Sequence, residues 1–302
     1  MRTIITGGTG LIGSALAADL AASGEEVILL SRDPSRTRSL PSGVRAERWD
    51  GHSAAGWGAL ADGARAIVNL AGESIAGGRW TAARKQRILE SRVNAGRAVV
   101  EAVQAAATKP QVVVQASAVG FYGPRGTERV TESSDPGSDF MSLVCQQWEQ
   151  STATLDTLGV RRTVIRTGIV LSRKGGALPK LLLPFRFFAG GPLGNGRQGF
   201  PWIHIADQVA AMRFLIENPA ARGPFNLSAP SPLPNREFSQ ALGRAMGRPS
   251  VMPAPAFMLR LALGEMATVL LDGQLAVPDR LLAESYRFRF VDAETALRDL
   301  LS

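Results

Sequence analysis

The stretch T-G-G-T-G-L-I-G, residues 6–13, decides the fold. It follows a short apolar run at residues 2–6 and precedes a segment with helical apolar periodicity. Gly7, Gly10 and Gly13 give the spacing G-x-x-G-x-x-G. Between a strand and a helix, such glycines allow a tight turn, a close backbone approach to a pyrophosphate and close packing of the helix. We predict a dinucleotide-binding loop that includes Leu11 and Ile12; the alternative is a purely structural glycine turn.

Further apolar runs alternate with helical patterns along the first half of the chain. The runs are rich in β-branched residues without strict alternation, which is typical of strands buried on both faces. The predicted strands lie at 26–31, 65–70, 111–116 and 161–166, and the helices between them at 81–107 and 140–158. This order predicts an α/β fold, a Rossmann-type doubly wound parallel sheet with a smaller, mostly helical C-terminal substrate subdomain.

After residue 171 the sequence is punctuated by glycine and proline, and helical patterns dominate. A short strand is expected at 224–228 and a helix after it, with Asn235 as N-cap. We expect residues 1–170 to form the cofactor domain, with 199–228 returning to it. Residues 171–198 and 229–302 would then form a substrate-binding cap.

Composition narrows the functional classes. The chain has 302 residues, a formal net charge of +8 and one cysteine. One cysteine excludes a disulfide scaffold, and we expect a cytoplasmic protein because a signal-peptide pattern is missing. No apolar stretch is long enough to span a membrane, and the basic residues are scattered, so we expect neither a membrane nor a nucleic-acid partner.

A small-molecule substrate fits better, and it would be anionic if Arg79, Arg186 and Arg197 line its pocket. The sequence is compatible with an oligomer and does not set its order.

The end of the second predicted strand indicates the cofactor. An acidic residue there would hold the ribose 2′-hydroxyl of NAD, whereas an arginine accommodates the 2′-phosphate of NADP. The chain has Ser31 and Arg32 at this place, with Asp33 past the expected strand end. A serine hydroxyl and a bidentate guanidinium both suit a phosphate, so we predict NADP(H).

These motifs together resemble the extended short-chain dehydrogenase/reductases. More narrowly, the chain is similar to the atypical "epimerase family protein" subgroup of the NAD(P)-dependent epimerase/dehydratases. The resemblance covers essentially the whole chain. It rests on the glycine motif and on V-N-L-A-G-E, A-S-A-V-G-F-Y-G, R-T-G-I-V-L, F-P-W-I-H-I-A-D and L-L-D-G-Q-L-A-V-P-D-R-L-L.

The resemblance implies roles for further residues. Leu70, Ala71 and Gly72 would lie against the adenosine side of the cofactor. Arg92 would face the cofactor from the long helix; the alternative is an exposed helix arginine. Val170 would pass near the nicotinamide.

The extended family works with a serine or threonine and a Y-x-x-x-K pair on one helix, where the lysine lowers the pKa of the phenol. The matching helix here is D-F-M-S-L-V-C-Q-Q-W-E, residues 139–149. One register places Met141 and Cys145 at the pair's positions, and a shift by one places Phe140 and Val144 there. Neither restores the pair, and Cys145 is interpreted as a packed small hydrophobe.

Ser117 and Tyr122 remain as catalytic candidates, against the alternatives of a loop hydroxyl and a packed aromatic. His204 is interpreted as structural, and two histidines with one cysteine do not form a metal site. Two functions stay open. The chain is either an NADP(H)-dependent oxidoreductase or epimerase for a small carbonyl or sugar-like substrate, or a catalytically silent NADP(H)-binding sensor or scaffold.

Overall fold

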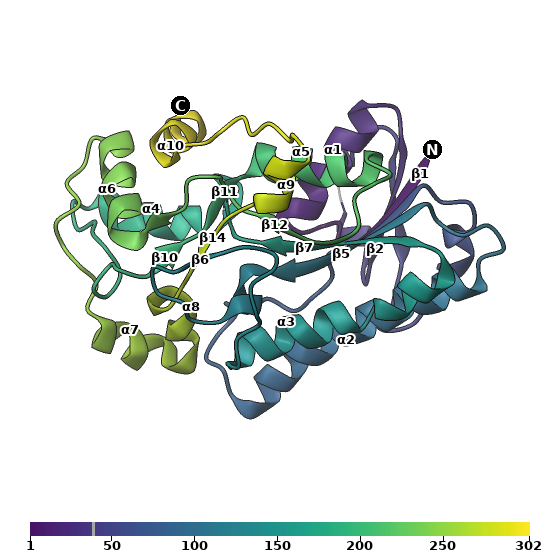
Figure 1. The fold of residues 1–302 in the computed structure, drawn as a ribbon, viewed down its shortest axis with the longest axis horizontal. Helices are drawn as coiled ribbons and strands as arrows, with labels where there is room; N and C mark the ends of the chain where they lie inside the picture. Colours follow the sequence, from purple (N-terminus) through teal and green to yellow (C-terminus); the bar gives the residue numbers. More distant parts are fainter. Residues whose placement is uncertain (38–39) are drawn as a thin grey trace.

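A seven-stranded parallel sheet forms the centre of the molecule (Figure 1). The computed structural model describes residues 1–37 and 40–302. The strand order is β12-β7-β5-β4-β1-β2-β3. The bounds are β1 Arg2–Thr6, β2 Glu26–Ser31, β3 Val44–Arg48, β4 Ala66–Asn69, β5 Val112–Ala118, β7 Arg161–Thr167 and β12 Gly223–Leu227.

Helices cover both faces of this sheet (Figure 1). Helices α1 (Leu11–Ala22) and α5 (Ile205–Glu217) pack on one face, and α2 (Ala82–Ala105) and α3 (Phe140–Gln150) on the other. In β1, Ile5 belongs to the core under α1 and α5, and its neighbour Ile4 to the core under α2. Both faces of the strand are therefore buried, which explains the continuous apolar runs and confirms the predicted fold class.

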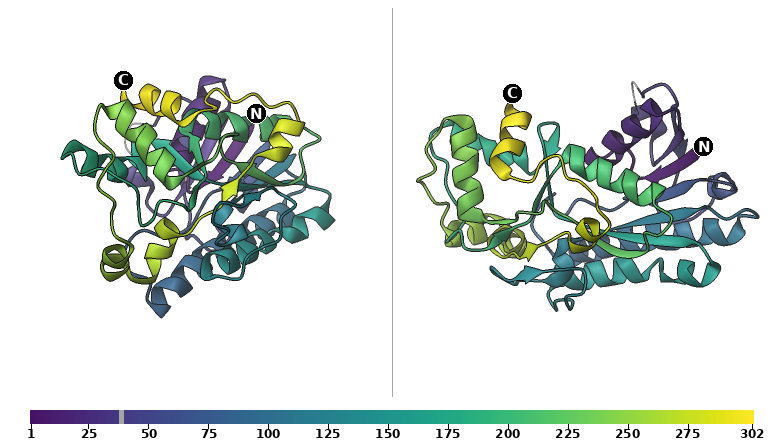
Figure 2. Two further views of the ribbon diagram at one scale, coloured as in Figure 1. Left: turned by 60° about the vertical axis from the view of Figure 1, so that its left-hand side comes forward. Right: turned by 45° about the horizontal axis from the view of Figure 1, so that its top comes forward.

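Most of the remaining elements form a smaller, mostly helical part at one end of the sheet (Figure 2). Its core contains Phe185, Trp202, Phe238 and Leu297. Its helices are α4 Leu178–Arg186, α6 Asn235–Met246, α7 Ala256–Leu263, α8 Thr268–Leu271, α9 Asp279–Ala283 and α10 Ala293–Leu301. Short strands are β6 Arg129–Val130, β8 Ile169–Ser172, β9 Gly175–Gly176, β10 Gly199–Phe200, β11 Trp202–His204, β13 Leu233–Pro234 and β14 Leu275–Ala276. Of the 3₁₀ helices, Pro34–Arg36, Gly58–Ala61 and Ala153–Leu158 pack on β3, α2 and β7 of the sheet domain, Val119–Tyr122 packs on α3, and Gly264–Ala267 follows α7.

Three local expectations need correction. Strand β3 was not expected, because V-R-A-E-R is largely charged and forms the exposed edge of the sheet. The helix expected at 140–158 is divided, since α3 ends at Gln150 and a 3₁₀ helix follows. Asn235 is the first residue of α6 and does not cap it; its side-chain oxygen accepts a hydrogen bond from the amide of Leu193 at 2.8 Å. Among the described residues, no helix is long and apolar enough to cross a membrane.

Candidate functional site

The glycine loop between β1 and α1 has no room for a side chain at Gly7 or Gly13. Gly7 adopts φ +66°, and a Cβ on it would lie 2.9 Å from the carbonyl carbon and oxygen of Leu70. A Cβ on Gly13 would lie 2.6 Å from the carbonyl oxygen of Gly7. Both contacts are closer than real Cβ atoms show, so the loop lies tightly between α1 and the end of β4. This close packing needs glycine at both positions.

Helix α1 begins at this loop with an open N-terminus. Its N-cap is Gly10, and within the described residues no side chain caps the helix. Gly10 is exposed, and Leu11 and Ile12 are half-buried behind it. Because the first-turn amides carry the positive end of the helix dipole, they form an anion-binding surface at the carboxyl edge of a parallel sheet. The arrangement fits a pyrophosphate.

A buried polar network stiffens this edge of the sheet. The Thr6 hydroxyl donates to the Asn69 side-chain oxygen at 2.6 Å and accepts the amides of Leu70 and Ala71, each at 3.1 Å. The Asn69 amide donates to the Gln115 side-chain oxygen at 2.9 Å. These contacts fix the turn after β4. The sequence signal was a polar residue inside each of three apolar strands, since burial of such groups is costly unless they are paired.

The end of β2 carries the predicted phosphate-binding pair. Ser31 is half-buried, and its hydroxyl oxygen accepts the Asp33 amide at 3.2 Å. Arg32 is exposed. Arg48 on β3 is the register partner of Ser31, so the edge strand that the sequence did not predict adds a second arginine near this end of the sheet.

Arg92 lies across the segment that follows β4. A Cβ on Gly72 would lie 3.0 Å from the Arg92 guanidinium carbon. Arg92 donates to the carbonyl oxygens of Glu73 at 3.0 Å and Ile88 at 2.8 Å, and its guanidinium lies 4.9 Å from the centre of the Trp148 ring. The side chain is half-buried, which argues against the alternative of an exposed helix arginine.

Val170 is brought to the glycine loop by a small hairpin. It lies on β8, which pairs with β9, and a Cβ on Gly176 of β9 would lie 3.0 Å from a Leu11 methyl carbon. Before β8, a Cβ on Gly168 would lie 2.3 Å from the carbonyl oxygen of Pro201. The chain therefore passes close to the start of α1 on its way into the C-terminal part.

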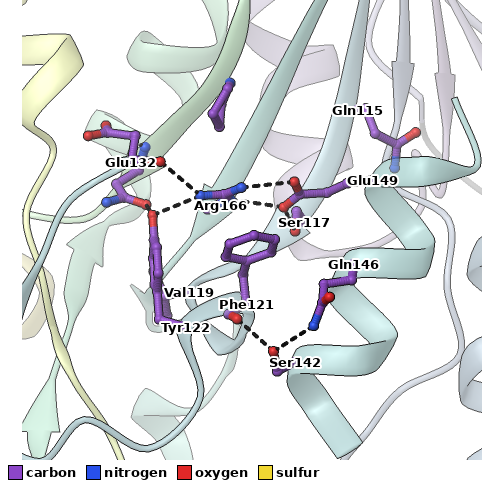
Figure 3. A network of polar contacts seen from close by, with 12 residues as sticks. Gln115, Ser117, Val119, Phe121, Tyr122, Glu132, Ser142, Gln146, Glu149 and Arg166 are labelled. Atoms are coloured by element: carbon purple, nitrogen blue, oxygen red, sulfur yellow. Dashed lines mark hydrogen bonds and ion pairs between the residues drawn. The ribbon is translucent and has the colours of Figure 1, made fainter. Parts of the chain in front are cut away.

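Ser117 lies at the end of β5 in a network with a buried ion pair (Figure 3). Its hydroxyl donates to the Glu149 carboxylate at 2.7 Å. Arg166 holds this carboxylate with two hydrogen bonds, of 2.9 and 3.0 Å, and its guanidinium lies 3.4 Å from the centre of the Phe121 ring. A serine hydroxyl has one proton, and here that proton is donated in the hydrogen bond to Glu149. Towards any other partner, the Ser117 oxygen can therefore only accept a hydrogen bond. Sequence reasoning missed Glu149, which is the only acid on α3.

Tyr122 lies on the buried side of the same network, where Arg166 stands between it and Glu149. Its ring is fully buried, and its hydroxyl donates to the Asn226 side-chain oxygen at 2.6 Å and accepts from Arg166 at 3.2 Å. Burial raises the pKa of the phenol to about 12. This geometry favours the alternative of a packed aromatic (Figure 3).

The structure distinguishes the two registers left open for α3. A Cβ on Gly120, in the loop after Ser117, would lie 3.5 Å from the Met141 Cβ and 3.8 Å from the Cys145 sulfur. Phe140 packs on Trp80 in a cluster that contains Val144, and Met141 packs against the edge of this cluster as well. Met141 and Cys145 therefore lie on the face of α3 that is turned towards Gly120, in the segment after Ser117, here called the serine loop. Burial raises the pKa of the Cys145 thiol to about 12, so it is no nucleophile near neutral pH.

The other candidates lie apart from this centre. His204 caps α5 through its Nδ1, which accepts the Ala206 amide at 3.0 Å, in agreement with a structural role. Arg79 donates to backbone carbonyls of α7 at Leu261 and Ala262. Arg186 and Arg197 are exposed on the cap. In residues 1–37 and 40–302, no three His, Cys, Asp or Glu side chains are grouped to hold a metal ion.

Comparison with known proteins gives matches over the whole chain. The model of the NAD dependent epimerase/dehydratase family matches residues 3–228, and a domain of unknown function, DUF1731, matches 254–300. The epimerase family protein YfhF of Bacillus subtilis is 38% identical over 303 residues, covering 100% of this chain and 98% of YfhF. The mouse epimerase family protein SDR39U1 is 39% identical over 306 residues, with 100% of both chains covered. The crystal structure of the human epimerase family protein SDR39U1 (isoform2) with NADPH superimposes with a TM-score of 0.88 at 36% identity, covering 99% of each chain.

Proposed function

Because the chain belongs to the NAD dependent epimerase/dehydratase family, we propose that it binds NADP(H) and acts on a small carbonyl or sugar-like substrate. The observation that carries the proposal is the glycine loop, which presents the open N-terminus of α1 at the carboxyl edge of the sheet. The human relative, 36% identical, was crystallised with NADPH, which supports the choice of cofactor.

Each part of the cofactor has residues that suit it. The pyrophosphate would lie on Gly10–Gly13, and the 2′-phosphate on Ser31 and Arg32. The adenosine side would lie along Leu70–Gly72 with Arg92 beside it, and Val170 would face the nicotinamide. When bound, the nicotinamide supplies or accepts a hydride. We assign cofactor binding to 1–170 with 199–228, and substrate binding to the cap formed by 171–198 and 229–302.

The catalytic set in this proposal differs from a tyrosine–lysine pair. Ser117 would orient the substrate, because it lies at the end of β5 and Glu149 fixes the direction of its hydroxyl. Because the hydroxyl proton is already donated to the Glu149 carboxylate, the serine oxygen can accept a hydrogen bond from the substrate. This suits a substrate hydroxyl better than a carbonyl. Arg166 keeps the carboxylate in place. Arg186 and Arg197 on the cap would favour an anionic substrate.

The cofactor proposal is tested by titrating the protein with NADPH and NADH and following the fluorescence of each. We expect tighter binding of NADPH. Arg32→Ala should reduce that preference at least about tenfold, since charge-assisted hydrogen bonds contribute about 1.5–3 kcal/mol. Arg129→Ala, an exposed arginine on β6, is the matched control and should leave the preference unchanged. Equal affinity for both cofactors in the unmodified protein would refute the choice of NADP(H).

A catalytically silent NADP(H)-binding sensor or scaffold is the second candidate. It is favoured by the positions of the missing tyrosine–lysine pair on α3, where Met141 and Cys145 stand and neither supplies an acid or base near neutral pH. A panel of carbonyl compounds and nucleotide sugars separates the two functions. Tight NADPH binding without turnover across the panel supports the sensor, and robust turnover of any member rules it out.

A further inference from the structure

The C-terminal part exposes a set of large apolar side chains, here called the apolar patch. All are more than half exposed; the extremes are Met252 at 55% and Phe187 at 73%. The patch consists of Phe187, Phe188, Val251, Met252, Phe257 and Leu261. Helix α7, with the sequence A-F-M-L-R-L-A-L, has no buried residue at all. A helix that is apolar and yet unburied needs a partner to cover it.

Two segments build the patch, and hydrogen bonds hold them side by side. The amides of Val251 and Met252 both donate to the Gly190 carbonyl at 3.0 Å, just after α4. Leu193 and Ala254 form a β-bridge. Helices α4 and α7 lie at the end of the molecule opposite the N-terminus (Figure 1). The two segments that carry these apolar side chains therefore lie side by side at this end of the molecule.

Phe188 shows that the exposure is built into the backbone. It adopts φ +59°, which is uncommon for a bulky residue and costs conformational free energy. The residue is nevertheless 57% exposed, and the Arg248 guanidinium lies over its ring at 4.4 Å from the ring centre. The chain thus holds an aromatic ring towards solvent in a strained conformation, with a positive charge beside it.

Basic residues predominate in the segments that carry the patch. Residues 178–194 and 248–263, which supply every member of the patch, contain Lys180, Arg186, Arg248 and Arg260. The same two segments contain no aspartate or glutamate. Asp272 lies close enough to Arg260 for their charges to interact, and Glu265 lies in the 3₁₀ helix that follows α7, so the border is predominantly basic. An apolar surface with such a border is complementary to a surface that is apolar inside and anionic outside.

We propose that the apolar patch docks on an anionic lipid surface, with its phenylalanine and leucine side chains in the acyl boundary and the four basic side chains at the headgroups. A second copy of the chain fits poorly, because a two-fold contact places the patch on itself and brings two basic borders together. A bilayer also needs no complementary groove on the protein. This inference is independent of the proposed function, and it differs from the sequence-based expectation of no membrane partner.

Flotation with vesicles tests the proposal on the full chain. Phosphatidylcholine vesicles with about 30 mol% phosphatidylglycerol should bind the protein, and phosphatidylcholine alone should bind it far more weakly. Arg248→Gln with Arg260→Gln should lower the partition coefficient about 30-fold, because each lost charge near such a surface changes it about fivefold. Phe257→Ser with Leu261→Ser should lower it at least about tenfold.

The control is a pair of exposed apolar residues outside the patch. Leu143 on α3 and Val291 are 48% and 52% exposed, and changing both to serine should leave vesicle binding intact. Thermal unfolding of each variant shows whether it is folded. Absence of binding to anionic vesicles overturns the proposal, and so does an equal loss in the control pair. A dimer of the unmodified protein that Phe257→Ser with Leu261→Ser dissociates also overturns it, in favour of a second copy.

Discussion

Replacement of Gly7 by alanine tests whether the glycine loop needs this residue for its backbone conformation alone or also for the close approach to β4. Gly7 adopts φ +66°, and its new Cβ would lie 2.9 Å from the Leu70 carbonyl carbon and oxygen. Gly63 is a matched control, because it has the same φ of +66° and nothing lies within 4 Å of the Cβ position. Both substitutions share the backbone cost and the entropy change of the unfolded chain.

The magnitude follows from the difference between the two sites. The left-handed conformation costs alanine roughly 1–2 kcal/mol at either position. At Gly7 the overlap with backbone atoms adds about 1–3 kcal/mol, as other overpacked sites do. That addition corresponds to an extra fall in Tm of roughly 2–6 °C for a chain of this size. If the loop shifts to relieve the overlap and must return on binding, NADPH affinity falls about 5- to 150-fold.

Two measurements decide the question. Thermal unfolding of Gly7→Ala and Gly63→Ala gives the stability difference, and NADPH fluorescence titration gives the difference in affinity. We expect Gly63→Ala to bind NADPH as the unmodified protein does. The reasoning is refuted if both variants lose the same stability and keep the same affinity, because the approach of Gly7 to Leu70 would then carry no cost.

The buried ion pair, the cysteine and a buried acid give three further predictions. Glu149→Ala leaves the Arg166 guanidinium without its carboxylate, so urea denaturation should show a loss of about 3–5 kcal/mol, and Glu149→Gln a smaller one; equal losses would contradict the charge argument. Because burial holds the pKa of Cys145 at about 12, a disulfide reagent at about pH 8 should label the thiol only after unfolding, and rapid labelling of the native protein would be inconsistent with this. Burial raises the pKa of the Glu132 carboxyl above its ordinary 4.5, so the folded state binds this proton more tightly and stability falls as pH rises from 4.5 through the raised value. Glu132→Gln removes this contribution, and its Tm should decline less over that interval; an unchanged decline would assign the effect to other groups.

The sequence was sufficient for the sheet, because β1, β2, β4, β5, β7 and β12 are short runs buried on both faces and a continuous apolar run reports this directly. It failed at β3, where V-R-A-E-R has the composition of a surface loop. The pairing of β3 with β2 depends on backbone hydrogen bonds at an edge, which leave little trace in side-chain pattern.

At the candidate site, sequence reasoning found groups that are local in the chain and missed those that are not. The glycine loop is contiguous, so its spacing could be recognised. Glu149 lies 32 residues from Ser117, and its partner Arg166 is on another strand, so only the fold brings them together. The exposure of α7 could not be predicted from the sequence either. Its apolar run has the composition of a core helix, and yet none of its residues is buried.

The stretch at 139–149 limits what chemistry α3 can perform. Its face towards the serine loop has Met141 and Cys145, and the positive charge of Arg92 on α2 acts on the Cys145 sulfur by lowering its pKa. Burial outweighs that charge, because the net pKa of the thiol is still raised to about 12. A cation near this position therefore does not by itself create an acid or base. On the same helix, Glu149 supplies the acidic group that Met141 and Cys145 do not, because the Ser117 hydroxyl already donates to its carboxylate.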